Sequence, residues 1–315
     1  MFVAGDYGTI FHRDSIAWQY VSGGQWYQLE AVWGLDANNV WTGGGSSTAF
    51  PINGQGSNYA VFGKYDGTGW SLGGFSFSSQ GQDIPSSIWA SSSSDIFVGI
   101  GTYYCPAIVR HDGTQWAATG LCNNHGTKVY DLSGISSKDV IAVGNGAGGS
   151  PQGNGWHWDG SQWFGMGTGT WDDLQAVWAT GWGDAFAVGK NGKVFYFNGT
   201  TWQAQGSGTA STLNAVWGTS PTSVFTVGAS GAMLYYNGST WSVITSVTTK
   251  DLFGIRGTST SNVYAVGDGG LILHFDGSTW KAEVSGTGFR LRAIWGSATD
   301  GFFAVGERGT ILYKQ

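Results

Sequence analysis

The stretch that decides the fold runs over residues 213–241 and reads Leu213-Asn-Ala-Val-Trp-Gly218, Val224-Phe-Thr-Val-Gly228, Ala232-Met-Leu-Tyr-Tyr236 and Asn237-Gly-Ser-Thr-Trp241. Its apolar pieces are short and rich in β-branched and aromatic residues, and Gly, Asn, Ser or Thr separate them. This pattern is typical of short strands joined by tight turns. It predicts four consecutive strands, which we name a, b, c and d in chain order, with the last Trp at the start of strand d.

The same pieces recur along the chain. The Trp that starts strand d stands at residues 163, 202, 241 and 280, and the Gly that ends strand b stands at residues 189, 228, 267 and 306, so each series has a spacing of 39. The c–d turn opens with Asp-Gly or Asn-Gly at residues 66, 112, 159, 198, 237 and 276, and these dipeptides are the strongest short signal for a hairpin. Four strands in about 40 residues are typical of a propeller blade. The sequence therefore predicts an all-β fold, with residues 1–315 as a single β-propeller domain.

The two ends of the chain leave the number of blades open. The chain starts with b, c and d pieces (Phe2–Gly5, Thr9–Arg13 and Trp18–Val21) and ends with a, b and c pieces at Gln315. In total it holds seven a, eight b, eight c and seven d strands. Eight blades with incomplete end blades fit this count, and so do seven blades in which the termini share a blade and one b–c hairpin is spare. Because both terminal b–c pairs keep the repeat pattern, we favour eight blades.

The repeats resemble those of bacterial β-propellers with degenerate Asp-box, or photosystem-assembly-factor-like, repeats. The resemblance covers nearly the whole chain and is carried by a strand-a pattern followed by Gly-x-x-Gly-x-Ile, Asp-Gly and Trp, as in residues 267–280. The turn Asp276-Gly-Ser-Thr-Trp280 is one residue shorter than the Ser-x-Asp-x-Gly-x-Thr-Trp of an Asp-box. The resemblance implies the propeller fold, which hosts many unrelated activities.

The composition indicates a weakly charged, acidic chain. Charged residues make up 11% and the net charge is -6, so we expect no nucleic-acid partner, since Lys and Arg supply the attraction to phosphates. We expect no membrane insertion, because no run of 18 apolar residues occurs. The first eight residues carry neither the basic nor the apolar part of a signal peptide.

The two halves of the repeat region differ in regularity. Residues 174–315 keep the spacing of 39, whereas residues 22–173 carry extra residues. The insertions fall in b–c loops (43–58, 101–106 and 145–155) and in d–a loops (72–83 and 117–128). In an antiparallel blade these two kinds of loop emerge on the same face. Because loops on a rigid scaffold usually carry binding sites, we predict that this face binds a partner.

Aromatic side chains stand among Gly, Ser and Asn in and beside these loops. The candidate binding residues are Phe50, Tyr59, Phe75, Phe77, Tyr103, Tyr104, His125, Trp156 and Trp171. Flat apolar rings next to small polar groups suit a sugar ring or a protein surface. The alternative is that the rings pack locally over the rim of the propeller. The sequence therefore predicts a non-catalytic recognition protein that binds a glycan or a protein.

Two cysteines map to the face with the insertions. Cys105 lies at the end of a b–c insertion, and Cys122 lies in the d–a insertion of the same blade. We predict that they form a disulfide, which would imply an oxidising compartment and a secreted, cell-surface or periplasmic location. Two free thiols in a cytosolic protein are the alternative.

An enzyme is the second hypothesis for function. The Asp-box resemblance suggests a sialidase-like glycoside hydrolase or a lyase with its site at the mouth of the channel. A sialidase needs three clustered Arg residues, a Tyr nucleophile with a Glu partner and an acidic residue. The chain has only six Arg and three Glu. Arg256 takes the Trp place of its strand a, and Arg290 and Arg292 flank another strand a, which is too little for that site, so we predict no catalytic residues.

Recurring polar residues have a structural interpretation. Four of the five His residues stand at the end of strand c, at positions 12, 111, 157 and 274. Recurrence at one repeat position indicates a structural role, so we predict no metal site there. Asp172-Asp173 and the segment from Asp36 to Asn39 have oxygen ligands suited to Ca²⁺, but turn capping is the expected role, and no cofactor is predicted. A third hypothesis is an assembly-forming protein whose unmatched terminal strands pair between molecules.

Overall fold

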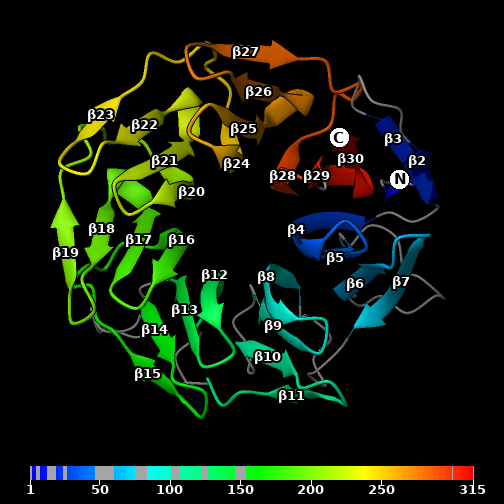
Figure 1. The fold of residues 1–315 in the computed structure, drawn as a ribbon, viewed down its shortest axis with the longest axis horizontal. Coiled ribbons are helices and arrows are strands. Elements are labelled where there is room, and N and C mark those ends of the chain that lie inside the picture. Colours follow the sequence, from blue (N-terminus) through cyan, green and yellow to red (C-terminus); the bar gives the residue numbers. More distant parts are fainter. Residues whose placement is uncertain are drawn as a thin grey trace.

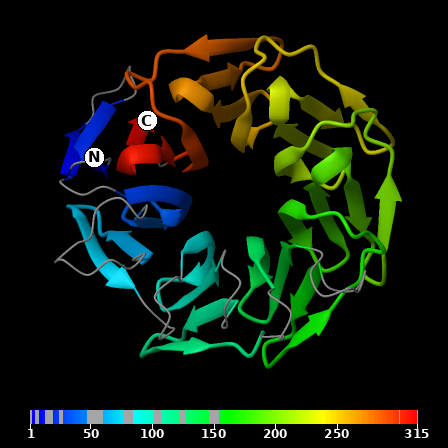
Figure 2. The same ribbon diagram turned by 180° about the vertical axis from the view of Figure 1, so that it is seen from behind.

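The computed structural model shows seven antiparallel sheets arranged in a ring around a central channel (Figure 1, Figure 2). It describes residues 2–4, 8–12, 19–23, 27–46, 60–75, 84–100, 107–121, 127–145, 154–299 and 301–314. The all-β propeller predicted from the repeat is confirmed, and the thirty strands counted in the sequence match the strands β1 to β30. Within the described residues, no helix has the length and apolar character needed to cross a membrane.

Six blades are continuous in sequence, each with strand a at the channel and strand d outside. Blade 1 holds β4 (Tyr27–Asp36), β5 (Asn39–Ser46), β6 (Ala60–Tyr65) and β7 (Trp70–Phe75), and blade 2 holds β8 (Pro85–Ser92), β9 (Asp95–Ile100), β10 (Ile108–His111) and β11 (Trp116–Ala118). Blade 3 holds β12 (Val129–Ser136), β13 (Asp139–Gly144), β14 (Gly155–Trp158) and β15 (Trp163–Gly165), and blade 4 holds β16 (Leu174–Gly181), β17 (Asp184–Gly189), β18 (Val194–Phe197) and β19 (Trp202–Gln205). Blade 5 holds β20 (Leu213–Ser220), β21 (Ser223–Gly228), β22 (Met233–Tyr236) and β23 (Trp241–Val243), and blade 6 holds β24 (Leu252–Ser259), β25 (Asn262–Gly267), β26 (Ile272–Phe275) and β27 (Trp280–Glu283).

The seventh blade joins the two ends of the chain, which lie side by side in both views (Figure 1, Figure 2). Its strands a, b and c are β28 (Leu291–Ser297), β29 (Gly301–Gly306) and β30 (Ile311–Lys314), and its strand d is β3 (Gln19–Gly23). Strands β2 (Gly8–His12) and β1 (Phe2–Ala4) extend this sheet outward. The eight blades favoured from the sequence are therefore wrong. Because β3 supplies the strand that β28 to β30 lack, the ring closes at seven blades and one b–c hairpin is spare.

The apolar core lies in the seams between neighbouring blades. Each cluster of buried apolar residues joins two consecutive blades. Between blades 7 and 1, for example, Phe303 and Tyr313 pack with Leu29 and Val40. A blade with a neighbour on both sides needs apolar residues on both faces of its strands. This explains why all six residues of β9 and of β21 are buried.

A tryptophan and a glycine form the contact between neighbouring strands a. A Cβ atom on Gly257 of blade 6 would lie 2.6 Å from the ring of Trp217 in blade 5. In the same way, a Cβ atom on Gly218 of blade 5 would lie 2.8 Å from the ring of Trp178 in blade 4. The Trp-Gly pair in strand a is therefore explained by packing, since four of the five Trp rings lie on the Gly of the next blade, and Trp33 faces a blade with Ala90 at that place.

The b–c and d–a connections lie on one face, as the sequence predicts. In the regular blades, the b–c connection is a short 3-10 turn whose first residue donates its backbone N–H to the end of a d–a connection. Lys190 donates to the carbonyl of Asp173 at 3.0 Å, and Ala229 donates to that of Thr212 at 2.8 Å. The c–d turns end the strands on the opposite face. There the Asp276 carboxylate accepts the backbone N–H groups of the two residues after Gly277, and so caps the turn.

Candidate functional site

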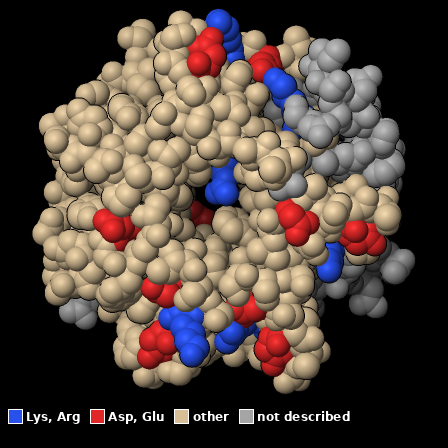
Figure 3. Space-filling view, viewed as in Figure 1, with Lys and Arg blue, Asp and Glu red and all other residues tan. Residues whose placement is uncertain are grey.

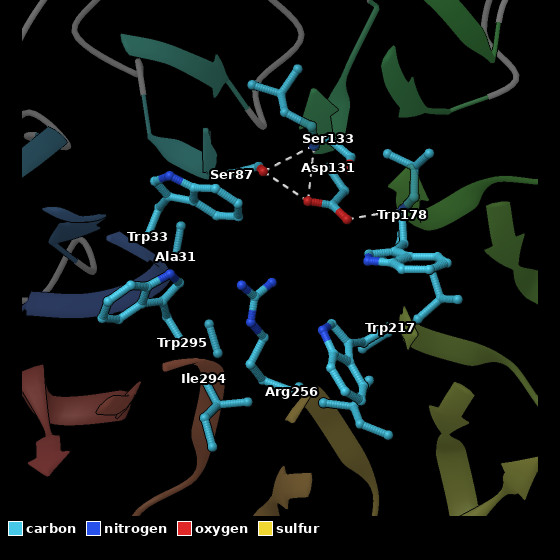
Figure 4. Close-up of a pocket in the computed structure, with 18 of the residues that line it drawn as sticks. Ala31, Trp33, Ser87, Asp131, Ser133, Trp178, Trp217, Arg256, Ile294 and Trp295 are labelled. Carbon is cyan, nitrogen blue, oxygen red and sulfur yellow. Dashed lines mark hydrogen bonds between the residues drawn. The ribbon is translucent and has the colours of Figure 1, made fainter. Parts of the chain in front are cut away.

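The seven strands a line the central channel, which holds a cavity of about 640 Å³ (Figure 3, Figure 4). These strands repeat one six-residue motif, written Leu213-Asn-Ala-Val-Trp-Gly218 in blade 5. Positions one and four of the motif are apolar in every blade and pack into the seams. The positions that depart from the motif therefore determine what the channel offers to a ligand.

The second position of the motif differs in every blade. Its seven residues line the cavity and are all half-buried: Glu30, Ser86, Tyr130, Gln175, Asn214, Phe253 and Arg292. We call this set the mouth ring. It lies at the face with the b–c connections, because Arg292 lies 3.6 Å from Glu307, which opens the b–c turn of blade 7 (Glu307–Gly309).

A β-bulge places each residue of the mouth ring. In blade 5, Leu213 pairs with Gly228 and Ala215 pairs with Val227, which leaves Asn214 without a partner on strand b. The same shift in register occurs at this point in all seven blades. A bulge re-aims the side chain of its extra residue. The repeat thus directs seven different side chains to one opening.

Charges gather on the part of the mouth ring that blades 6, 7 and 1 contribute. Glu30 and Arg292 approach to 3.7 Å, and Arg290 binds Asp268 and lies 3.3 Å from Glu307. Burial raises the pKa of the Glu30 carboxyl, and the Arg292 charge lowers it by less. The mouth-ring residues of blades 2 to 6 are uncharged, so the two charged members, Glu30 and Arg292, lie together on neighbouring blades. Over the face in Figure 3, charged side chains are sparse and stand in small mixed groups.

Two blades replace the tryptophan at position five of strand a. Blade 3 has Ser133, whose hydroxyl accepts the backbone N–H of Ala179 at 3.0 Å. Blade 6 has Arg256, whose Nε donates to the carbonyl of Gly296 at 3.4 Å and whose guanidinium carbon lies 5.5 Å from the centre of the Trp33 ring. Burial lowers the pKa of Arg256 to about 10, so the side chain stays charged at neutral pH. The two residues come from facing sides of the channel, and Arg256 projects toward its middle (Figure 4).

A half-buried residue with a carboxylate, Asp131, stands at position three of blade 3. One oxygen accepts the Ser87 hydroxyl at 2.8 Å and the Leu132 backbone N–H at 2.9 Å, and the other accepts the Val177 backbone N–H at 2.9 Å. Asp131 therefore joins blades 2, 3 and 4 (Figure 4). Burial raises its pKa to about 6, and these hydrogen bonds lower it by less.

Most of the binding residues predicted from the sequence belong to the long loops. Phe50, Tyr59, Phe77, Tyr103, Tyr104, His125 and both cysteines, Cys105 and Cys122, lie outside the described residues. Phe75 ends strand β7, where it pairs with Ala60. The proposed disulfide and most of the aromatic set thus stay predictions.

The other two predicted residues lie in different surroundings. Trp171, on the d–a connection before blade 4, is 59% exposed, as a residue that binds a ligand would be. Trp156 is only 4% exposed and packs in the core between blades 2 and 3. The b–c insertion ends before Trp156, which belongs to strand β14 and pairs with Ala142. The structure therefore places Trp156 in the core and not on the binding face.

Two of the recurring histidines connect strand c to strand b. His157 Nε2 lies 2.8 Å from Asp139 Oδ1, and His274 Nε2 lies 2.8 Å from Asn262 Oδ1. Asp139 and Asn262 are the first residues of their b strands. These bonds give His157 and His274 the structural role that the recurrence predicts.

In the two segments considered for Ca²⁺, Asp36 caps its own turn, and Asp172 and Asp173 bind side chains of the b–c turn of blade 4. The Asp36 carboxylate accepts the Asn38 backbone N–H at 2.8 Å and the Asn39 side-chain amide at 3.0 Å. Asp172 accepts the Asn191 side-chain amide at 2.7 Å, and Asp173 binds Lys190 at 2.6 Å. In the described part of the chain, no group of three or more His, Cys, Asp or Glu residues is placed to hold a metal.

Solved structures with a similar fold include a propeller bound to a peptide. The ring resembles YCF48. The structure of YCF48 bound to D1 peptide has a TM-score of 0.71 and 13% identity, and the match covers 96% of this chain and 98% of that one. YCF48 from Cyanidioschyzon merolae has a TM-score of 0.68 and 15% identity, with 95% and 99% coverage. The WD40 propeller domain of Doa1 has a TM-score of 0.66 and 9% identity, with 92% and 93% coverage.

These similarities confirm, at the level of the fold, the resemblance to photosystem-assembly-factor-like propellers. No protein-family model and no curated protein sequence matches the chain. At 9 to 15% identity, the structural likeness supports the fold, and the argument for function depends on the channel itself.

The mouth ring and Asp131 were missed by the sequence predictions. The sequence does hold a signal for the mouth ring, because an alignment of the seven strands a shows that the second position changes in every blade. The predictions concentrated on long loops, which stand out by length, whereas the mouth ring differs only by residue type.

Proposed function

We propose that this protein is a non-catalytic propeller that binds a protein partner through the mouth ring and the surrounding b–c and d–a connections. The observation that carries the proposal is the variation of the mouth ring on a repeated scaffold. Positions one and four of strand a stay apolar in all blades because packing requires it. The bulged second position lies outside that packing, and its seven residue types suit contacts with an irregular surface.

The chemistry of the mouth ring fits a polypeptide. Phe253 and Tyr130 offer aromatic surface, Gln175 and Asn214 offer amide groups, and Arg292 pairs with an acid. Protein interfaces combine aromatic contacts with hydrogen bonds and charged groups at the rim. The similar ring of YCF48, solved with D1 peptide, supports the idea that a propeller of this size can hold a peptide.

Peptide display against the purified protein tests the proposal. We expect selected peptides to bind the parent protein and to lose about tenfold or more of their affinity for a Tyr130→Ala, Phe253→Ala variant, since buried aromatic contacts dominate interfaces. A Thr200→Ala variant is the matched control, because Thr200 is exposed on a c–d turn of the opposite face. Peptides that bind the mouth variant as well as the parent would contradict the proposal.

A glycan is the second candidate ligand, and the exposed Trp171 supports it. This indole lies on the binding face beside Asp172, and an exposed ring next to polar groups suits a sugar. A glycan array run on the parent protein and on Trp171→Ala distinguishes the two ligands. Binding that depends on Trp171 and not on Phe253 would favour a glycan.

The location of the protein is a separate proposal. We infer an extracytoplasmic location from the pairing predicted for Cys105 and Cys122. Mass spectrometry of peptides from a non-reducing digest tests it. Two unlinked cysteines in protein purified under oxidising conditions would contradict the inference.

A further inference from the structure

Arg256 is the half-buried arginine without an acidic partner in the part of the chain that the structure describes. Arg110 binds Asp95, Arg290 binds Asp268, and Arg292 lies near Glu30 and Glu307. Arg256 has only the Gly296 carbonyl at 3.4 Å and the face of Trp33. Its guanidinium therefore carries a charge into the channel with little compensation.

Packing does not explain an arginine at this position. Five blades have Trp there, and in blade 5 the Trp217 side chain is 6% exposed and fills the contact with Gly257. Over Gly296 of blade 7 the Phe302 ring takes the place that a Trp ring has over Gly257, which explains why blade 6 has no Trp there but does not call for a charge. Partial burial of an unpaired charge costs free energy, which the lowered pKa of Arg256 reflects. A bound anion would compensate this cost.

We propose that Arg256 binds a carboxylate group that the partner protein inserts into the channel, an inference that rests on the proposed function. A guanidinium presents two parallel N–H groups that match the two oxygens of a carboxylate. The indoles of Trp33, Trp178, Trp217 and Trp295 line the same cavity. Such an apolar wall strengthens a charged hydrogen bond. Asp131 lies on the facing wall of the channel, but it does not serve as the carboxylate partner of Arg256, because both of its oxygens already accept hydrogen bonds from other groups.

Small carboxylates test this site without the partner. The chain has six arginines, so protein labelled with ¹⁵N-arginine gives a simple Nε–H spectrum in which Arg256 is assigned by substitution. The probes are N-acetylglycine, which mimics a chain end, and the α-amide of N-acetylglutamate, which mimics an acidic side chain. We expect a saturable shift of the Arg256 signal with both probes, and the tighter probe identifies the source of the carboxylate. N-acetylglycinamide, which has no charge, should give no shift.

The control variant is Arg256→Met, which keeps an unbranched side chain and removes the charge, and its binding of N-acetylglycine is compared with that of the parent protein by calorimetry. Residual binding should be about tenfold or more weaker, as for the loss of a charged hydrogen bond. Equal shifts with the uncharged amide, or equal shifts at Arg290 and Arg308, would overturn the site. Because no partner is needed, a failure of peptide display would reject the proposed function and leave this result unaffected.

A second observation concerns the ends of the chain, which carry nearly the same b–c hairpin twice. Residues 2–13 read Phe-Val-Ala-Gly-Asp-Tyr-Gly-Thr-Ile-Phe-His-Arg, and residues 303–314 read Phe-Ala-Val-Gly-Glu-Arg-Gly-Thr-Ile-Leu-Tyr-Lys. Only one copy occupies blade 7. Strand β3 pairs with β30, and Tyr20 stands opposite Leu312. Strands d and c of blade 6 pair in the same register, with Ala282 opposite Leu273. Strand β2 pairs with the other edge of β3.

We infer that residues 2–13 can replace residues 303–314 in blade 7. The C-terminal copy fits better because Tyr313 is 1% exposed and the N-terminal copy has the polar His12 at this position, while the exchanges of Val3 for Ala304 and Ala4 for Val305 offset each other. Less apolar burial makes the N-terminal copy the weaker competitor. Either hairpin would supply the main-chain hydrogen bonds that blade 7 needs.

Deletions and a designed disulfide test this exchange. We expect a cooperative unfolding transition after deletion of residues 2–13 or of residues 303–315, and its loss after both deletions. In a background with Cys105→Ser and Cys122→Ser, Val3→Cys should cross-link to Ile294→Cys only when residues 303–315 are absent. The pair Ala304→Cys and Ile294→Cys in the full chain is the control, since these positions are directly paired. No Val3–Ile294 cross-link in the shortened chain would overturn the inference.

Discussion

The seam between blades 5 and 6 and the seam between blades 6 and 7 lie at equivalent places in the ring and have different contents. In the first, Trp217 lies against Gly257, and a Cβ there would come within 2.6 Å of the ring. In the second, Phe302 takes the place over Gly296, and Arg256 contacts the Gly296 carbonyl at 3.4 Å and the face of Trp33. The comparison teaches that one repeat position can serve either packing or the channel. Where the Trp of strand a is absent, another ring fills the seam and the channel has one more polar group.

The largest expected effect is the loss of a tryptophan from a seam. Trp217→Ala should destabilise the protein by about 3–5 kcal/mol, because it removes a buried ring and leaves a cavity against Gly257. Arg256→Ala should cost clearly less, since that side chain has few apolar contacts in its seam. Urea unfolding followed by circular dichroism measures both. Similar losses for the two variants would break the comparison.

The other seam without a tryptophan, between blades 3 and 4, should make stability depend on pH. Burial raises the pKa of Asp131 to about 6, so the folded chain holds this proton more tightly than the unfolded chain, whose carboxyl titrates near its usual value of about 4. The free energy of unfolding should therefore fall as the pH rises from about 4 to about 6, by up to about 3 kcal/mol. Unfolding curves of the parent and of Asp131→Ala between pH 4 and pH 7.5 isolate this contribution. Identical pH dependence in both proteins would refute it.

The glycine under a tryptophan gives a smaller effect. Gly257→Ala should destabilise the protein by about 2 kcal/mol, because the added methyl group overpacks against Trp217 and the Asn262 carbonyl, both 2.6 Å away. Combining it with Trp217→Ala should remove part of the cost, since the ring is then absent. Additive effects in the double mutant would show that the two residues do not act as one contact.

The smallest expected effect is a gain. Arg256→Met should stabilise the protein by about 1 kcal/mol, because it replaces a partly buried charge by an apolar side chain of similar length. Thermal unfolding of the variant beside the parent protein checks this. A lower melting temperature would mean that the contacts of Arg256 with the Gly296 carbonyl and Trp33 stabilise the seam between blades 6 and 7.

The sequence determined the blade and most of its contacts. The spacing of 39 between Trp202, Trp241 and Trp280 predicts equal units, and Asp276-Gly277 predicts the c–d turn that the structure shows. These features depend on neighbours in the chain, so the pattern alone reports them. The loops were predicted as the binding face from their length. The mouth ring was not predicted as a binding site. A bulge at Asn214 or Gln175 depends on pairing with strand b, and the pattern of apolar residues does not change at these positions.

The sequence by itself determined that this protein is a propeller, because each repeat has to bury both faces of its strands against copies of itself. Only the tertiary structure decided that the ring closes at seven blades, since two nearly identical hairpins compete for one place beside Tyr20. It also decided that Arg256 and Asp131, 125 positions apart in the chain, share one channel. Closure and channel both depend on how many blades complete a turn, and that number is set by packing around the whole ring.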